Sequence, residues 1–249
     1  MPRTLVSWNV NGLDDHRLDE RTEAACLALL LPASLTAPQP PPDAILLQEL
    51  VVRSWHAHWK HHLHHAGYAV FPPDPPASTD SEYFCALAIR GDHPVTAHGV
   101  EPFPNSDMGR ALVWARAGGW WIATSHLESG AAASDVRRAQ LATVAARLLA
   151  EPGPAIFAGD TNLRRDEAEG VPGADQLVDA WVAAGPPTRE DARHLELPGS
   201  RTPGARFDRA LHNAARARWR SVDGPRRGPR RGAASDHRSP CGSPLDAPP

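Results

Sequence analysis

The stretch "AIFAGDTNLR" (155–164) changes from apolar to polar within the length of one β-strand. Its first half is continuously apolar, which is typical of a strand that is buried on both faces of a sheet. Asp160 and Asn162 follow where the apolar run stops. The stretch "AILLQEL" (44–50) repeats this pattern and places Glu49 near its end. Two buried strands with polar ends predict a layered α/β protein with helices outside its sheets.

Polar side chains also end the other apolar runs of the chain. A rigid sheet fixes the side chains at its strand ends, so we predict that these residues gather into one site. Carboxylates, carboxamides and imidazoles make the set rich in oxygen donors, which suits Mg²⁺. The further members are Asn9 in "TLVSWNV" (4–10), His126 in "WWIATSHLE" (120–128) and Asp208 in "ARFDRALH" (205–212).

The remaining pattern predicts a single α/β domain over residues 1–249, without an internal repeat or a dividing linker. Residues 17–31 have buried-type side chains at helical spacing, namely Leu18, Thr22, Ala25, Cys26 and Leu29. We also expect helices at 53–67, 134–150, with Ser134 as its cap, and 177–185. Further strands are expected at 68–73, 83–90 and 111–117, the last joined to 120–128 by the hairpin glycines Gly118 and Gly119.

The composition is that of a soluble globular protein. The chain has 249 residues, 41% hydrophobic residues and a formal net charge of -3. Three cysteines without ligand spacing predict neither a disulfide framework nor a zinc motif. No apolar stretch is long enough to cross a bilayer and the N-terminus lacks a secretion signal, so we expect a cytoplasmic protein without a membrane partner. We also expect a monomer.

Six short motifs, taken in order, resemble the endonuclease/exonuclease/phosphatase superfamily: "SWNVNGL", "LLQE", "SHLES", "FAGDTNLR", "RFDR" and "SDH". The wording "SHLES…GDTNLR…RFDR" is most similar to its tyrosyl-DNA phosphodiesterase branch. The resemblance implies a DNase I-like four-layer sandwich, in which two facing mixed β-sheets are flanked by helices. It also implies a metal-dependent phosphodiesterase that uses Mg²⁺, or Mn²⁺, and acts on DNA ends.

The resemblance implies a role for each site residue. Glu49 matches the principal metal ligand, Asn9 lies beside metal and phosphate, and Asp236 lies near the metal. Asp160 matches the carboxylate that activates water, and Asn162 would donate hydrogen bonds to the developing phosphorane. The phosphate contacts would come from His126, His237, Ser129 and Arg164, with Asp208 hydrogen-bonded to His237. An ion pair of Asp208 with Arg206 or Arg209 is the alternative reading of "RFDR".

Other functions stay open from sequence alone. The substrate could be another phosphoester, such as an abasic site, a lipid headgroup or a small phosphate. A catalytically impaired relative that binds nucleic acid is the alternative outside the enzymes. Within the arginine-rich loop at 216–234, the segment 216–231 could contact a DNA backbone or be disordered. Residues 238–249 form an atypical tail, because Pro240 and Pro244 exclude the regular strand that would hold His237.

The histidine-rich segment within 53–67 has a spacing that zinc sites use. His58/His62 and His61/His65 are both i,i+4 pairs, and such pairs can hold Zn²⁺ on one helix face. The histidines are nevertheless spread over several faces of the expected helix. The prediction is therefore a solvated helix face without a specific metal site.

Overall fold

The computed structural model describes residues 4–31, 41–75, 83–164, 166–183 and 207–213. These residues form two β-sheets, a four-stranded sheet in the order β1-β2-β4-β3 and a six-stranded sheet in the order β5-β6-β7-β8-β10-β9. The first contains β1 (Leu5–Asn9), β2 (Ala44–Leu50), β3 (Tyr68–Phe71) and β4 (Phe84–Arg90). The second contains β5 (Val95–Pro102), β6 (Ala111–Ala117), β7 (Trp120–Thr124), β8 (Ala155–Asp160), β9 (Val178–Asp179) and β10 (Asp208–His212).

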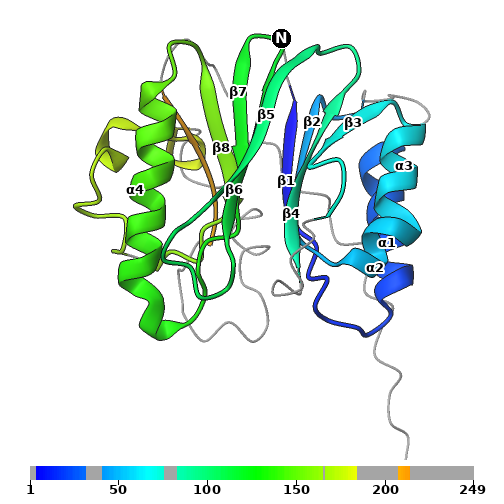
Figure 1. Cartoon of the computed structure of the whole chain (residues 1–249), viewed down its shortest axis with the longest axis horizontal. Helices are drawn as coiled ribbons and strands as arrows, with labels where there is room; N and C mark the ends of the chain where they lie inside the picture. The colour runs from blue at the N-terminus through cyan, green and yellow to red at the C-terminus, as the bar shows by residue number, and fades with distance from the viewer. Residues whose placement is uncertain (1–3, 32–40, 76–82, 165, 184–206, 214–249) are drawn as a thin grey trace, which may run out of the picture.

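Helices cover the outer face of each sheet, which makes the four layers that Figure 1 shows. The four-stranded sheet is covered by α1 (Leu18–Leu30), α2 (Val52–Ser54), the π-helical turn η1 (Trp55–Trp59) and α3 (Lys60–His65). The six-stranded sheet is covered by α4 (Ser134–Ala150). The remaining elements of the described residues are short: η2 (Ala131–Ala133), η3 (Ala174–Gln176) and α5 (Ala180–Ala183). Both sheets are mixed, since β1–β2 and β7–β8 are parallel and the other pairs antiparallel. The expected architecture is confirmed.

Strand β2 shows why its sequence is continuously apolar. Ile45 and Leu47 pack against the helices, whereas Ala44 and Leu46 pack into the core between the two sheets. Successive side chains of a strand point to opposite faces, so a strand between two packed layers buries both sets. All four residues have no solvent exposure. The apolar run is therefore a consequence of the position of β2 inside a four-layer molecule.

The periodicity predictions hold for the longest elements. The five residues expected to face the core from 17–31 are all buried on α1, and Leu141, Val144, Ala145 and Leu148 are buried on α4. The hairpin between β6 and β7 is antiparallel, and its Gly118 and Gly119 have φ values of 56° and 84°. A left-handed backbone of this kind favours glycine because no Cβ meets the following carbonyl.

Several local predictions were wrong. Ser134 is the first residue of α4 and not its cap, because the turn η2 leads directly into the helix. The segment 177–185 begins with strand β9 and only then becomes the short helix α5. The expected helix 53–67 contains a π-helical turn. Strand β5 was missed, because its side chains alternate between exposed and half-buried and it offers no apolar run. Among the described residues, no helix is long and apolar enough to span a membrane.

Candidate active site

The end of β1 connects the two sheets through one side chain. The amide nitrogen Nδ2 of Asn9 donates to Oε1 of Glu49 at 3.0 Å and to Oδ2 of Asp160 at 3.0 Å. Glu49 belongs to the four-stranded sheet and Asp160 to the six-stranded sheet. The amide oxygen of Asn9 accepts the backbone N–H of Asn11 at 2.9 Å, which fixes the orientation of the amide. Asn9 therefore holds two carboxylates together across the sandwich.

Glu49 points toward this position because β2 is irregular there. The pairing of β2 with β4 shifts register between Leu47 and Leu50, and Glu49 has a φ of 56°. Bulges of this kind redirect a side chain, and a left-handed non-glycine residue is strained unless its surroundings hold it. Gly12 provides part of that support, since its backbone N–H donates to the carbonyl of Glu49 at 3.1 Å. A Cβ on Gly12 would lie 2.2 Å from that carbonyl oxygen, so only glycine fits.

The end of β8 is held against the segment that follows β7. His126 and Asp160 form a parallel bridge, and the backbone N–H of Leu127 donates to the Asp160 carbonyl at 2.9 Å. A Cβ on Gly159 would lie 2.2 Å from the carbonyl oxygen of Ser125. This close approach explains the glycine in "FAGD" and brings His126 and Asp160 side by side.

Asn162 turns the chain immediately after the strand. It has a φ of 50°, and its backbone N–H donates to Oδ1 of Asp160 at 2.9 Å. Its side-chain nitrogen donates to the carbonyl of Leu127 at 3.0 Å. That bond uses one of the two N–H groups of the Asn162 amide. The carboxylate of Asp160 is thereby held from two sides, by Asn9 and by Asn162.

His126 is a buried, neutral imidazole between the two carboxylates. Its Nδ1 lies 3.5 Å from Oε1 of Glu49 and its Nε2 lies 3.6 Å from Oδ2 of Asp160. Burial lowers the pKa of His126 to about 4, although the negative charge of Asp160 opposes this shift. Nδ1 has no hydrogen-bond partner among the described residues. The ring therefore presents its two nitrogen atoms to both carboxylates.

This donor set fits a hard divalent cation. Carboxylate oxygens are the ligands that Mg²⁺ and Mn²⁺ prefer, and Glu49 and Asp160 present them at one point. The amide nitrogen of Asn9 occupies the position between the carboxylates, and nitrogen of an amide donates hydrogen bonds but does not ligate cations. Asn9 therefore orients the carboxylates, and the other oxygen atoms of Glu49 and Asp160 could hold a cation.

Three other predicted residues lie in the same part of the molecule. Ser129 follows His126, and its hydroxyl contacts Sδ of Met108 at 3.2 Å. The Nη1 atom of Arg164 donates to the carbonyl of Ala131 at 3.4 Å. Asp208 is exposed and pairs in register with Asp160 across β10 and β8. The roles expected for these residues remain predictions.

The last predicted motif is outside the described residues. This applies to Asp236 and His237, to Arg206, to the arginine-rich loop 216–234 and to the tail 238–249. Arg209, the other alternative partner of Asp208, lies with its Nη1 3.5 Å from Oδ2 of Asp179.

A buried ion pair supports the loops around the site and was missed in the sequence. Arg137 on α4 has no solvent exposure and donates to both carboxylate oxygens of Glu167, at 2.9 and 2.6 Å. It also donates to the carbonyls of Glu128 and Gly130, at 3.3 and 2.7 Å. The guanidinium holds the pKa of Glu167 at about 2. Arg137 lies at a core position of the α4 periodicity, and this was the available signal for a buried charge.

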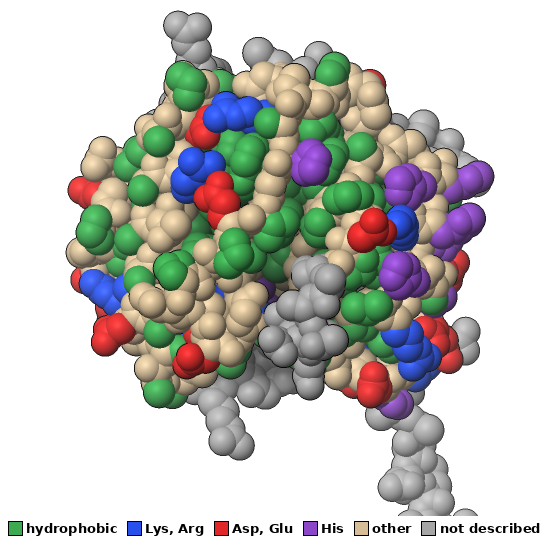
Figure 2. Space-filling model, viewed as in Figure 1, with side chains coloured by type: hydrophobic (Ala, Val, Ile, Leu, Met, Phe, Trp, Pro, Cys, Tyr) green, Lys and Arg blue, Asp and Glu red, His purple; other side chains and the backbone are tan. Residues whose placement is uncertain are grey.

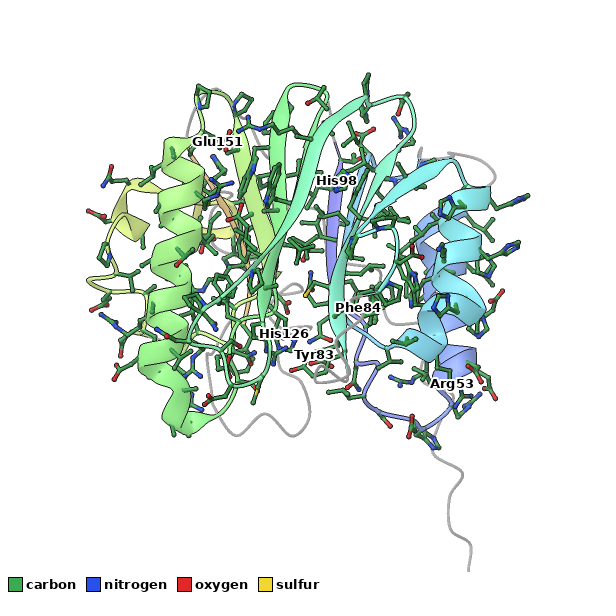
Figure 3. The ribbon with its side chains drawn as sticks, in the orientation of Figure 1. Arg53, Tyr83, Phe84, His98, His126 and Glu151 are labelled. Carbon is green, nitrogen blue, oxygen red and sulfur yellow. The ribbon has the colours of Figure 1, made fainter. Side chains whose placement is uncertain are left out.

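Tyr83 and Arg110 were also missed, and both lie beside His126. The ring centroids of Tyr83 and His126 are 5.8 Å apart, and the guanidinium carbon of Arg110 lies 4.6 Å from the Tyr83 ring centroid. Figure 3 shows Tyr83 and His126 facing the same space between the two layers. Nε and Nη1 of Arg110 are buried without a hydrogen-bond partner among the described residues. No sequence signal identified either residue, because neither follows a recognisable strand end.

Comparison with known proteins agrees with this geometry. Residues 6–237 match the model of the Endonuclease/Exonuclease/phosphatase family. The chain belongs to this family. Its members depend on a divalent metal ion, in keeping with the carboxylates at the ends of β2 and β8.

The chain is similar to tyrosyl-DNA phosphodiesterase 2 from several animals. It is 30% identical to the Xenopus laevis protein over 85% of this chain and 56% of the relative, and 34% identical to the Mus musculus protein over 74% and 48%. The chain thus spans about half the length of these relatives. Among solved structures, D. rerio TDP2 complexed with a single-strand DNA product matches with a TM-score of 0.66 and 29% identity, over 86% of this chain and 84% of that one.

Proposed function

We propose that this chain is a metal-dependent phosphodiesterase that hydrolyses phosphoester bonds at DNA ends, with 5′-phosphotyrosyl-type links as its substrate. The observation that supports this most is the Asn9 amide, which joins Glu49 and Asp160 from opposite sheets. A neutral histidine, His126, lies against both carboxylates. The similarity to tyrosyl-DNA phosphodiesterase 2, including the D. rerio protein with its DNA product, supports the choice of substrate.

We assign each residue of the site a role in hydrolysis. Asp160, whose carboxylate is fixed by Asn9 and Asn162, accepts a proton from the attacking water. The water oxygen bonds to phosphorus while the bond from phosphorus to the phenolic oxygen breaks. The tyrosine leaves as a phenolate, which takes up a proton from solvent, and the DNA keeps a 5′-phosphate. The N–H groups of Asn162 and of neutral His126 can donate to the phosphorane oxygens, where negative charge grows.

A divalent cation held by Glu49 would stabilise that growing negative charge as a Lewis acid. We propose Mg²⁺ as this ion, with Mn²⁺ as a substitute, because the donors are hard oxygen atoms. We also propose that the protein acts as a cytoplasmic monomer without a membrane partner. Size-exclusion chromatography with light scattering tests the oligomeric state, and fractionation of cells tests the location.

The decisive experiment is hydrolysis of a 5′-phosphotyrosyl oligonucleotide by the purified full chain with Mg²⁺. Release of tyrosine and of a 5′-phosphorylated strand is expected, and Glu49→Ala should abolish it. Glu20→Ala is the matched control, since Glu20 is an exposed carboxylate of α1 that forms an ion pair with Arg17. Normal turnover by Glu49→Ala would refute the assigned metal position.

A panel of substrates separates the remaining readings. Hydrolysis of an abasic-site duplex, a lipid phosphodiester or a small phosphate ester, without release of tyrosine, would keep the chemistry and change the substrate. Binding of the oligonucleotide without turnover of any substrate would instead identify a nucleic-acid-binding relative.

A further inference from the structure

A second group of ligand-type side chains lies on the helical layer, at the opposite face of the four-stranded sheet from the core between the sheets. Glu23 on α1 approaches two histidines of the neighbouring helical segment. Its Oε2 lies 3.2 Å from Nδ1 of His58 and 2.9 Å from Nε2 of His62. One ligand atom from each residue lies within 4.8 Å of the other two. Two helices therefore direct three ligand atoms toward one point.

The local backbone explains why these two histidines share a face. His58 lies in the π-helical turn η1 and His62 lies one turn later in α3, at i,i+4 spacing. Trp55 and Trp59 of the same turn are fully buried, which anchors the segment with His58 directed toward α1. π-Helical turns inside α-helices often occur at functional sites. His61, His64 and His65 are exposed, so the predicted solvated face is confirmed for them but not for His58 and His62.

His58 has a second carboxylate partner, on the ring nitrogen that faces away from Glu23. Its Nε2 lies 3.4 Å from Oδ1 of Asp19, and Asp19 in turn forms an ion pair with Arg53. With a metal on Nδ1, the atom that faces Glu23, the proton of the ring would lie on Nε2 and point toward Asp19. Histidine ligands of metals usually have such a carboxylate or carbonyl on their other nitrogen. The cluster thus contains a set of ligands together with the group that orients one of them.

We propose that Glu23, His58 and His62 form a zinc-type metal site that is separate from the catalytic one. Two imidazoles and one carboxylate are a ligand set that Zn²⁺ uses when a fourth position stays open. With metal–ligand distances of about 2.0–2.2 Å, ligand atoms of a tetrahedral site lie about 3.3 Å apart, close to the two distances to Oε2. The side chains of His58 and His62 are 20% and 28% exposed, which leaves access for an ion and a water.

The site has the character of a cross-link between helices. Its ligands come from α1 and from the η1–α3 segment, and both pack on the same face of the four-stranded sheet. A metal bound in the folded state stabilises that state by mass action. Figure 2 shows that histidine side chains gather at one edge of the visible face, over the region of α3. Nitrogen ligands distinguish this site from the oxygen-rich catalytic site, so the two are expected to select different metals.

The test is a Zn²⁺ titration of the full chain, stripped of metals, against a coloured chelator and in excess Mg²⁺. The Mg²⁺ keeps the oxygen-rich site occupied by a hard cation. We expect one equivalent of tightly bound Zn²⁺. Asp19→Asn should weaken this binding by about 10–100-fold, the usual effect of removing the group behind a histidine ligand. Glu23→Gln or His62→Gln should weaken it more than Asp19→Asn.

The matched control is the double variant His61→Gln/His65→Gln, which removes an i,i+4 pair that has no carboxylate partner from α1. It should keep wild-type affinity. Zn²⁺ should also raise the melting temperature of the wild type but not that of Glu23→Gln. Equal affinity of the wild type and Glu23→Gln, or loss of binding in the control, would assign the metal to the histidine run and overturn the proposal.

A spectroscopic measurement on the wild type keeps the test decisive if a variant fails to fold. Co²⁺ in place of Zn²⁺ should give intense visible bands typical of a four-coordinate ion with nitrogen ligands. Weak bands of a six-coordinate ion, or no uptake of Co²⁺, would contradict the site. This result is independent of phosphodiesterase activity, because none of the three ligands belongs to the catalytic site.

Discussion

The two ligand clusters of this molecule differ in what holds them. The cluster of the proposed active site lies at strand ends, where the Asn9 amide donates to both Glu49 and Asp160. The helical cluster of Glu23, His58 and His62 lies on the outer layer, where its side chains are partly exposed. The first is fixed by backbone geometry before any ion binds. The second is held mainly by contacts among its own side chains, so a bound metal would contribute much more to its order.

The largest expected effect is on kcat, which should depend on the cluster of the proposed active site and not on the helical cluster. Asp160→Asn removes the proposed proton acceptor and should lower kcat by about 10²–10⁴-fold, while the melting temperature changes little. Glu23→Gln should leave kcat for the same oligonucleotide within a factor of about two, since it lies outside the catalytic site. Steady-state kinetics of both variants checks this. A large loss of kcat in Glu23→Gln would show that the clusters are not independent.

The free energy of unfolding should also distinguish the region of the proposed active site from the helical cluster. Glu167→Gln leaves the buried guanidinium of Arg137 without its charge partner, and the free energy of unfolding should fall by about 3 kcal/mol. Glu23→Gln in the absence of zinc should lower the free energy of unfolding much less than Glu167→Gln does, because Glu23 is partly exposed. Urea denaturation at pH 7 measures both. Equal losses of unfolding free energy in the two variants would contradict the structural role assigned to the buried Arg137–Glu167 pair.

The pH dependence of stability provides a related test. The pKa of Glu167 is lowered from 4.5 to about 2, so folding favours its charged form. Its contribution is therefore complete above pH 4.5 and is lost as the pH falls toward 2. The difference in unfolding free energy between wild type and Glu167→Gln should shrink over this window. A difference that stays constant from pH 5 to pH 2.5 would contradict the role of the charge.

The smallest effect is expected where neither cluster is involved. Arg17 and Glu20 form an i,i+3 ion pair at the start of α1, and both side chains are 64% exposed. Glu20→Gln should change the free energy of unfolding by less than about 0.5 kcal/mol, because exposed pairs are solvated in both states. A loss comparable to that of Glu167→Gln would show that α1 depends on its surface charges.

Sequence patterns predicted the elements whose burial is regular. Strands β2, β6 and β8 and helix α4 have the expected bounds, because each is packed on both faces or along one stripe. Strand β5 has half-exposed alternation without an apolar run, so its existence depends on pairing with β6. Hydrophobic periodicity does not contain such tertiary information.

The same reasoning explains the outcome at the sites. Asn9, Glu49, His126 and Asp160 were predicted together, because each ends or interrupts an apolar run and strand ends meet at one edge. Only part of the helical cluster could be predicted from the sequence. The spacing of His58 and His62 is local, but their meeting with Glu23 depends on how α1 packs 35 residues away along the chain. The π-helical turn that directs His58 has no sequence signature of its own.

The order of the strands along the chain has a practical consequence. Among the described residues, all strands of the first sheet lie before Gly91, and all strands of the second begin at Val95 or later. The short connection between them thus divides the catalytic residues, with Asn9 and Glu49 in one segment and His126 and Asp160 in the other. Two fragments divided at this connection should each lack the proposed phosphodiesterase activity. Activity after mixing would then show that the two fragments have associated. The chain could therefore be used as a split enzyme, in which the proposed phosphodiesterase activity reports the association of the two fragments.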